Sequence, residues 1–191
     1  MKTKKSNMKW WLIGAGALLL ILIAWGFGTY NKLITLDNTA QEKWGNVETQ
    51  YQRRIDLIPN LVSTVKGYAT YEQETFAKIT QLRSQWAGAG TIDDKITAAQ
   101  GMDSAISRLL LVAENYPELK ANENFLSLQD ELAGTENRIS VERTRYNEAV
   151  RNYNIATQKV PTNMIAGMFG FEQKKMFEAD KGAETAPKVT F

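Results

Sequence analysis

The sequence contains no cysteine and no histidine. Without cysteine, the chain has no disulfide, no lipid-modified cysteine, no thiolate nucleophile and no cysteine-ligated metal. Without histidine, it lacks the Ser-His-Asp and Cys-His mechanisms, and also the Glu-x-x-His pattern by which helical bundles hold two iron atoms. A metal would need ligands that are all oxygen atoms. We therefore expect no catalytic residue, no metal site and no cofactor.

Proline is also scarce, with four in the chain, and no run of β-branched residues alternates with period two. Between the prolines, apolar residues recur at intervals of three and four, which is typical of helices that bury one face. The helices predicted in this way cover residues 31–57, 59–87, 92–115 and 118–158. Such spacing suits an antiparallel bundle. The sequence therefore predicts an all-α protein with an antiparallel four-helix bundle of long helices, resembling coiled-coil packing.

Charge is absent from residues 10–30, WWLIGAGALLLILIAWGFGTY. A helix of about 20 residues crosses the hydrocarbon core of a bilayer, and aromatic residues lie towards both ends of this run, where they favour the membrane interface. A cleaved signal peptide is the alternative. Its apolar core is shorter, about 7–15 residues, and Ala24-Trp25-Gly26 is a poor cleavage site. We expect a retained single transmembrane helix.

The lysines predict the orientation of this helix. Four of the 23 basic residues and none of the 21 acidic residues lie in the basic tail, residues 1–9. Cytoplasmic flanks carry the excess of Lys and Arg, so the N-terminus is expected in the cytoplasm of a bacterial cell, with the bundle at residues 31–158 outside the inner membrane. The rest of the chain has a slight acidic excess, which argues against nucleic acid as a partner.

The stretch RRIDLIPN, residues 53–60, interrupts a long helical pattern. Pro59 lacks an amide hydrogen and disfavours helical geometry at Ile58. Arg53 and Arg54 suit the C-terminal end of one helix, and Asp56 suits the start of the next. We expect a corner between two helices here. The alternatives are a helix that continues through Pro59 and a functional patch.

A second corner is expected at Tyr116-Pro117 by the same reasoning, although Asn122 is an alternative start for the last long helix. Gly88-Ala89-Gly90 ends the second predicted helix, and Thr91 or Asp93 can cap the third. Trp44 and Trp86 lie on apolar faces and are expected in the core.

The C-terminal tail, residues 159–191, is partly apolar. Its run MIAGMFGF, residues 164–171, either folds back onto the bundle through Met164, Met168, Phe169 and Phe171 or lies in the membrane interface. We favour the first alternative. Val189-Thr190-Phe191 could make a short extended contact.

Several polar residues lie on or beside the apolar faces: Glu72, Glu114, Glu136, Asn137, Arg143 and Asn147. Buried charges are costly unless they are paired. We therefore expect Glu136 and Glu72 to meet arginines between helices, the candidates being Arg53, Arg54, Arg138 and Arg143. A carboxylate pair used for acid–base catalysis is the less favoured alternative.

Several blocks of the chain carry a family resemblance: QRRIDLIPNLVSTVKGYATYE (52–72), LLVAENYPELKANENFLSLQDELAGTENRIS (110–140), RYNEAVRNYN (145–154) and the tail MFGFEQKKMFEAD. In these blocks the chain resembles the LemA family of bacterial membrane-anchored helical proteins. The resemblance implies one N-terminal membrane helix, a helical bundle and no established enzymatic activity. A magnetosome membrane-formation protein looks like a relative, which points to membrane organisation.

We expect a membrane-tethered, non-enzymatic scaffold of the cell envelope. Its expected partners are the lipid bilayer and other membrane or envelope proteins, and a homo-oligomer is left open. A carboxylate-based enzyme and a membrane sensor or adaptor are the alternatives. The candidate structural or interaction residues are Arg53, Arg54, Asp56, Pro59, Asn60, Tyr68, Glu72, Glu114, Tyr116, Pro117, Asn124, Glu136, Asn137, Arg143, Tyr146 and Asn147.

Overall fold

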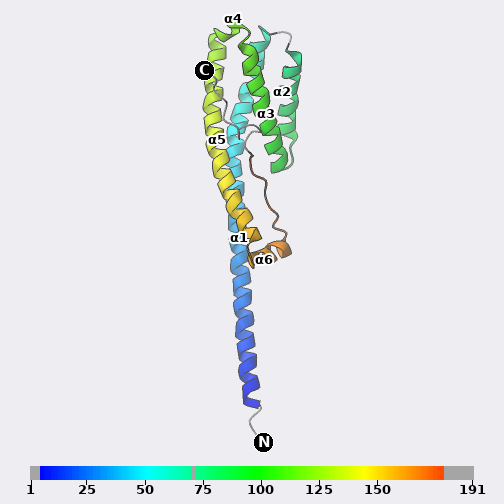
Figure 1. Cartoon of the computed structure of the whole chain (residues 1–191), viewed down its shortest axis with the longest axis vertical. Coiled ribbons are helices and arrows are strands. Elements are labelled where there is room, and N and C mark those ends of the chain that lie inside the picture. The colour runs from blue at the N-terminus through cyan, green and yellow to red at the C-terminus, as the bar shows by residue number, and fades with distance from the viewer. Residues whose placement is uncertain (1–4, 70–71, 179–191) are drawn as a thin grey trace, which may run out of the picture. The chain divides into compact units, whose positions relative to one another are not determined.

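The computed structural model describes residues 5–69 and 72–178, and it describes side chains from residue 10 onward within these ranges. The described chain is helical and contains no strand (Figure 1). Its helices are α1 (Lys5–Lys66), α2 (Gln73–Gly88), α3 (Ile92–Ala113), α4 (Pro117–Lys120), α5 (Glu123–Gln158) and α6 (Thr162–Phe169). The all-α class is therefore confirmed. Val189-Thr190-Phe191 lies outside the described residues.

The chain forms two compact units, each built from two separate stretches. Of the described residues, unit 1 contains 5–41 and 148–174, and unit 2 contains 42–69, 72–147 and 175–178. Helices α1 and α5 each contribute to both units, whereas α6 belongs to unit 1 alone. The division of the chain into a tail, a membrane helix, a bundle and a C-terminal tail stays a prediction.

Helix α1 continues through Pro59, so the corner expected there is wrong. Proline inside a helix costs about 3 kcal/mol, whereas one fully buried Ile, Leu or Val side chain contributes about 1.5–3 kcal/mol. On either side of the proline, Ile55, Ile58 and Leu61 are 3% exposed or less. Burial of this face therefore outweighs the local preference of Pro59, and the alternative of a continuous helix is correct.

The chain leaves α1 at Gly67 instead. The amides of Tyr68 and Ala69 both donate to the carbonyl oxygen of Val65, at 3.0 and 2.8 Å, and so close the last turn. The second predicted helix, residues 59–87, is therefore divided between the end of α1 and α2. The arginines and Asp56 lie inside α1, so their expected roles at helix ends are also wrong.

The other helix boundaries follow local signals. Pro117 occupies the first position of α4, as expected for a corner. The side chain of Asn122 accepts the amide hydrogen of Phe125 at 3.1 Å, which caps α5. Thr91 caps α3 by accepting from the amide of Asp94 at 3.1 Å. The corner at Pro117 and the cap at Thr91 are confirmed. The prediction of one helix over residues 118–158 is wrong, because the range is divided into α4 and α5, and the alternative start at Asn122 is correct.

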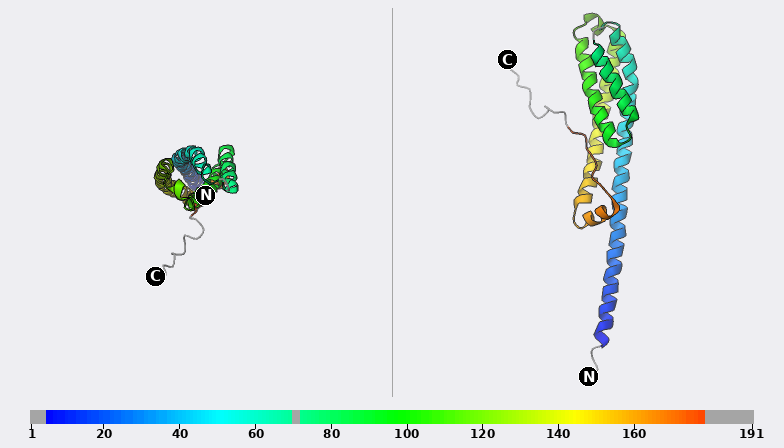
Figure 2. Two further views of the ribbon diagram at one scale, coloured as in Figure 1. Left: turned by 90° about the horizontal axis from the view of Figure 1, so that it is seen from above. Right: turned by 90° about the vertical axis from the view of Figure 1, so that its right-hand side faces the viewer.

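Unit 2 has an apolar core to which α1, α2, α3 and α5 all contribute. Helices α2 and α3 lie side by side (Figures 1 and 2), and a Cβ atom on Gly101 would lie 2.7 Å from a methyl carbon of Leu82. Glycine at this position therefore allows the close approach. Trp44 and Trp86 are 5% and 4% exposed, with ring centroids 6.5 Å apart, which confirms them as core residues. The antiparallel four-helix arrangement stays an expectation.

Unit 1 contains the uncharged segment of α1. An 18-residue window of this helix has a mean hydropathy of 2.1 with 6% of it buried, so by length and composition the helix can cross a membrane. Large apolar side chains along the segment are exposed, from Trp10 at 72% to Phe27 at 67%. Helix α6 packs beside the C-terminal end of this segment, where the ring of Phe169 lies 4.8 Å from that of Tyr30.

Candidate functional site

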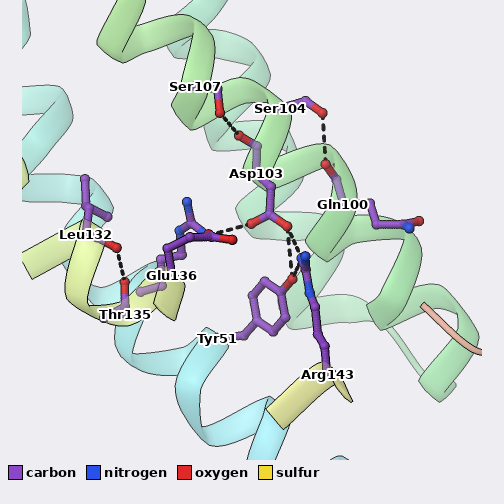
Figure 3. Close-up of polar contacts among 10 residues, drawn as sticks. Tyr51, Gln100, Asp103, Ser104, Ser107, Leu132, Thr135, Glu136 and Arg143 are labelled. Atoms are coloured by element: carbon purple, nitrogen blue, oxygen red, sulfur yellow. Dashed lines mark hydrogen bonds and ion pairs between the residues drawn. The ribbon is translucent and has the colours of Figure 1, made fainter. Parts of the chain in front are cut away.

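A cluster of buried and half-buried ionic groups joins three helices of unit 2 (Figure 3). Arg54 of α1 is 5% exposed. One of its terminal nitrogens, Nη1, donates to Asp103 Oδ1 of α3 at 2.8 Å, and the same atom bonds Glu136 Oε2 of α5. We call Tyr51, Arg54, Asp103, Glu136 and Arg143 the ionic cluster.

Asp103 is the central acceptor of the ionic cluster. Its Oδ2 atom accepts from the hydroxyl of Tyr51 at 3.0 Å and from Nη2 of Arg143. Arg143 also donates to the Tyr51 oxygen, and its guanidinium lies 5.3 Å from the centre of the Tyr51 ring. Both carboxylate oxygens of Asp103 are therefore bonded to protein groups.

Helical periodicity brings these residues together. Tyr51 and Arg54 are three residues apart on α1, and Glu136 and Arg143 are seven apart on α5, so each pair shares one face of its helix. Two guanidinium groups meet two carboxylates, so the charges balance. A buried charge is tolerated when a partner and hydrogen bonds replace water. The ionic cluster therefore links α1, α3 and α5 in one register.

Three sequence candidates, Arg54, Glu136 and Arg143, belong to the ionic cluster, and the expected pairing of Glu136 with an arginine is confirmed with Arg54. Glu72 precedes α2 without a side-chain cap, and within the described chain no ion pair joins it to the expected arginines. Apart from Tyr146 and Asn147, the remaining candidates are exposed or half-buried residues of unit 2: Arg53, Asp56, Pro59, Asn60, Tyr68, Glu72, Glu114, Tyr116, Pro117, Asn124 and Asn137. They do not form a single site.

Asp103 was missed by the sequence reasoning, although a signal for it exists. It follows Ile96 by seven residues and Ala99 by four, and both of these are buried. A charged residue at that spacing lies on the buried face of a helix and needs a partner. Tyr51 lies on the apolar face of the predicted helix 31–57, and apolar periodicity alone says nothing about the partner of its hydroxyl.

The segment after α6 packs on the ionic cluster through Phe177, which is 7% exposed. Its ring centroid lies 6.1 Å from that of Trp44 and 6.4 Å from that of Tyr51, and its centre lies 4.9 Å from the guanidinium of Arg143. Phe177 therefore covers the aromatic and cationic side of the ionic cluster inside unit 2.

Asn147 holds this segment by its backbone. Its Nδ2 donates to the carbonyl oxygen of Phe177 and its Oδ1 accepts from the amide of Phe177, both at 2.9 Å. The hydroxyl of Tyr146 donates to the carbonyl oxygen of Lys175 at 3.0 Å. These contacts give the two candidate residues a structural role, because they satisfy backbone groups that no helix or strand satisfies.

In unit 1, Asn154 makes the same paired contact with another residue of the segment. Its Nδ2 donates to the carbonyl oxygen of Lys174, and its Oδ1 accepts from the amide of Lys174, both at 2.9 Å. The ammonium of Lys174 also lies 2.7 Å from a carboxylate oxygen of Asp37. Asn154 lies seven residues after Asn147, and this asparagine spacing is a sequence signal that was overlooked.

A surface cavity of about 400 Å³ lies elsewhere in unit 2. It is lined by side chains of α1 and α5, including Asn60, Ser63, Asn124 and Ser127. The structure thus brings two sequence candidates, Asn60 and Asn124, to one polar surface, although they lie outside the ionic cluster.

Tyr146 should make stability depend on pH in the alkaline range. Burial, and secondly the charge of Asp93, raise its pKa from 10.0 to about 12. The folded state holds the phenol proton more tightly than the unfolded state does. The resulting contribution of Tyr146 to the free energy of unfolding is therefore complete below pH 10 and is lost as the pH rises from 10 through 12. Tyr146→Phe is expected to flatten this fall in melting temperature.

Thermal denaturation of the full chain in detergent between pH 8 and 12 measures the effect. Tyr153, whose pKa burial also raises, keeps part of the alkaline dependence in the variant. Tyr116→Phe is the control and should keep all of it. An unchanged profile in Tyr146→Phe would contradict the assignment.

The fold and the site define a class: an all-helical protein with one helix able to cross a membrane and an ionic cluster inside a helical unit. The profile of the LemA family matches residues 43–191, and the chain belongs to this family. The resemblance described from the sequence is thereby confirmed.

Two magnetosome relatives are similar over most of the chain. Magnetosome protein MamQ 2 and MamQ 1 of Paramagnetospirillum magneticum are each 28% identical over 187 residues, covering 84% of this chain and 68% of the relative. Protein LemA of Metamycoplasma hominis is 26% identical over 157 residues, covering 81% of this chain and 71% of that protein. None of these names states an enzymatic activity.

Proposed function

We propose that the protein is a membrane-tethered, non-enzymatic helical scaffold that presents unit 2 to other membrane or envelope proteins. The observation that carries the proposal is the composition of α1. This single helix contains the uncharged segment, residues 10–30, and also contributes Trp44, Tyr51 and Arg54 to the interior of unit 2. The same helix thus serves as membrane anchor and as part of the folded body.

The proposed cellular setting is the inner membrane of a bacterium, crossed once. The lysines of the N-terminal tail support a cytoplasmic N-terminus, because cytoplasmic flanks are rich in Lys and Arg. Unit 2 then lies on the periplasmic or external side. Relatives named magnetosome proteins support a role in organising a membrane or the cell envelope.

The arrangement of Asp103 favours a scaffold over an enzyme built on carboxylates. A general base must reach the proton that it removes, but both oxygens of Asp103 accept bonds from Tyr51, Arg54 and Arg143. A substrate would have to displace these buried partners. We propose that the ionic cluster keeps the helices of unit 2 in register, while the exposed candidates, such as Arg53 and Asn137, are available to partners.

Single cysteines test the proposed topology without a background, because the natural chain has none. A side chain at Gly88 meets no atom within 4 Å of its Cβ, so Gly88→Cys should fold normally. We expect an impermeant thiol reagent to label Gly88→Cys from outside the inner membrane, after permeabilisation of an outer membrane where one exists. Ser6→Cys, the matched control, should react only after the inner membrane is opened.

The reverse labelling pattern would contradict the orientation, and labelling of both sites in a soluble fraction would contradict the membrane tether.

A photo-crosslinker attached at the same Gly88→Cys site in intact cells then tests the scaffold role. We expect discrete adducts, either with other envelope proteins or with a second copy. Normal topology without an adduct at this site or at Asn137→Cys would contradict the scaffold.

A further inference from the structure

Helix α6 exposes an unusual amount of apolar surface for a segment of its length. Met164, Met168 and Phe169 are 69%, 76% and 56% exposed, and Val160, just before the helix, is 81% exposed. The spacing of four residues places Met164 and Met168 on one side of α6, and Val160 lies in the turn just before the helix. No charged residue occurs between Val160 and Phe171. We call these four exposed residues the apolar cap.

The rest of α6 packs on α1 within unit 1, and Phe169 of the apolar cap also touches α1. Ala166 is 3% exposed, and Cδ1 of Ile165 lies 4.0 Å from the position that a Cβ atom would occupy on Gly26. The ring of Tyr30 lies 4.8 Å from that of Phe169 and 5.7 Å from that of Phe171. The expectation that the 164–171 run folds back is therefore only partly correct. Phe169 and Phe171 meet α1, whereas Met164 and Met168 are exposed.

These contacts place α6 at one level along α1. Gly26 and Tyr30 are one helical turn apart and form the C-terminal end of the uncharged segment, residues 10–30. On the same turns of α1, Trp25 and Phe27 are 40% and 67% exposed. The apolar cap therefore adjoins the exposed apolar side chains at the end of the segment that can cross a membrane. The ribbons of α6 and α1 lie side by side at this place (Figures 1 and 2).

We propose that the apolar cap is a second membrane contact, which inserts into the interface of the leaflet where the transmembrane segment ends. An eight-residue helix is about 12 Å long, too short to cross a bilayer but long enough to lie along its surface. The ordinary fate of such a patch in water is association. With the proposed membrane tether, lipid would surround α1 at this level, so lipid is the occupant that the contact between the apolar cap and the end of this segment favours.

The flanking residues fit an interfacial position. Lys159 and Glu172, both exposed, border the uncharged run on its two sides, where charged heads can reach water or lipid headgroups. This second contact rests on the proposed membrane tether. It would hold the C-terminal end of α5 at the bilayer, in addition to the transmembrane segment of α1. The membrane would then hold the protein at two points of the chain.

Spin labels on single cysteines in the full chain, reconstituted in vesicles of phosphatidylethanolamine and phosphatidylglycerol, test this contact. Oxygen concentrates in lipid and a nickel chelate stays in water, so the ratio of their collision rates reports depth. We expect this ratio to be several-fold higher for Met168→Cys than for Leu111→Cys. Leu111, which is 60% exposed on α3, is a matched apolar control that should remain in water.

The Gly16→Cys variant distinguishes a wrong assignment of the second membrane contact from a wrong assignment of the membrane tether. A Cβ atom at Gly16 meets nothing within 4 Å, and its label should report deep lipid. If the Gly16 label reports lipid but the Met168 label behaves like that at Leu111, the second contact is wrong while the tether stands. If the Gly16 label reports water, both are wrong.

The labels also recognise a protein occupant. Two outcomes would mean that protein covers the apolar cap. In the first, the Met168 label is shielded from oxygen and from the nickel chelate alike. In the second, it shows dipolar coupling to labels on other copies even when the protein is highly diluted in lipid. Either result overturns the lipid assignment. The Met164→Cys variant repeats the measurement one turn away, and agreement between the two positions excludes a local effect of one substitution.

Discussion

Replacing Asp103 by alanine is expected to lower the free energy of unfolding by about 3 kcal/mol, the lower end of the cost of breaking a buried ion pair. The side chains of Asp103 and Arg54 are 18% and 6% exposed. Without the carboxylate, the guanidinium of Arg54 keeps the half-exposed Glu136 as its partner among the described residues, with a side chain 45% exposed, and the hydroxyl of Tyr51 loses Asp103 as its acceptor. Chemical denaturation in detergent, followed by far-ultraviolet circular dichroism, measures the loss.

Two further variants interpret this result. Asp56→Ala removes an exposed carboxylate on α1 and should change stability by less than about 0.5 kcal/mol. Asp103→Asn keeps an acceptor oxygen but removes the charge, so it should lose stability to an intermediate degree. A loss in Asp103→Ala no greater than that in Asp56→Ala would mean that the ionic cluster does not stabilise unit 2.

Phe177→Ala is expected to lower the free energy of unfolding by about 3–5 kcal/mol, the usual cost of truncating a buried phenylalanine. The ring fills space beside Trp44, Tyr146 and the guanidinium of Arg143. Removing it leaves a cavity and uncovers one side of the ionic cluster. The same denaturation experiment measures the loss, and amide hydrogen exchange at residue 177 should quicken as the segment opens.

The neighbouring residue supplies the control. Met176 is 38% exposed, so Met176→Ala should cost far less and leave exchange at residue 177 slow. If Phe177→Ala were as stable as Met176→Ala, the segment would contribute little to unit 2. Faster exchange without a loss of global stability would mean that the segment opens independently of the helices.

Local chemistry was enough to predict several features of the fold. The caps at Thr91 and Asn122 and the proline at position 117 act on backbone groups within three residues. The periodicity of apolar residues likewise predicted the buried positions of Trp44 and Trp86, because one helix face suffices to define them. These predictions needed no knowledge of distant residues.

Pro59 shows where local reasoning fails. Proline prefers the start of a helix and costs about 3 kcal/mol inside one. This cost competes with the free energy gained by burying the apolar side chains on both sides of Pro59. How deeply Ile55, Ile58 and Leu61 are buried depends on helices far along the sequence. The sequence offered a corner and a continuous helix as alternatives, and tertiary burial selected the second.

The ionic cluster was only partly predictable for a related reason. A charge on a buried face signals that a partner is needed, which led to Glu136 and an arginine. Arg53 and Arg54 are neighbours and point in different directions around α1, so only the exact rotation of the helix decides which of them pairs with Glu136. Asp103 belongs to a third helix, α3. Asn154 escaped notice because its partner is the backbone of Lys174, which carries no pattern in the sequence.

By itself, the sequence determined the helical class, the uncharged segment able to cross a membrane and the absence of thiol and imidazole chemistry, since these follow from composition and short-range periodicity. Tertiary structure alone decided that α1 continues through Pro59, that Asp103 and two arginines meet, and that Phe177 packs on Tyr51 and Arg143. The physical reason is that burial and ion pairing join residues 40 to 126 positions apart, and their combined free energy exceeds any local preference that a short stretch of sequence expresses.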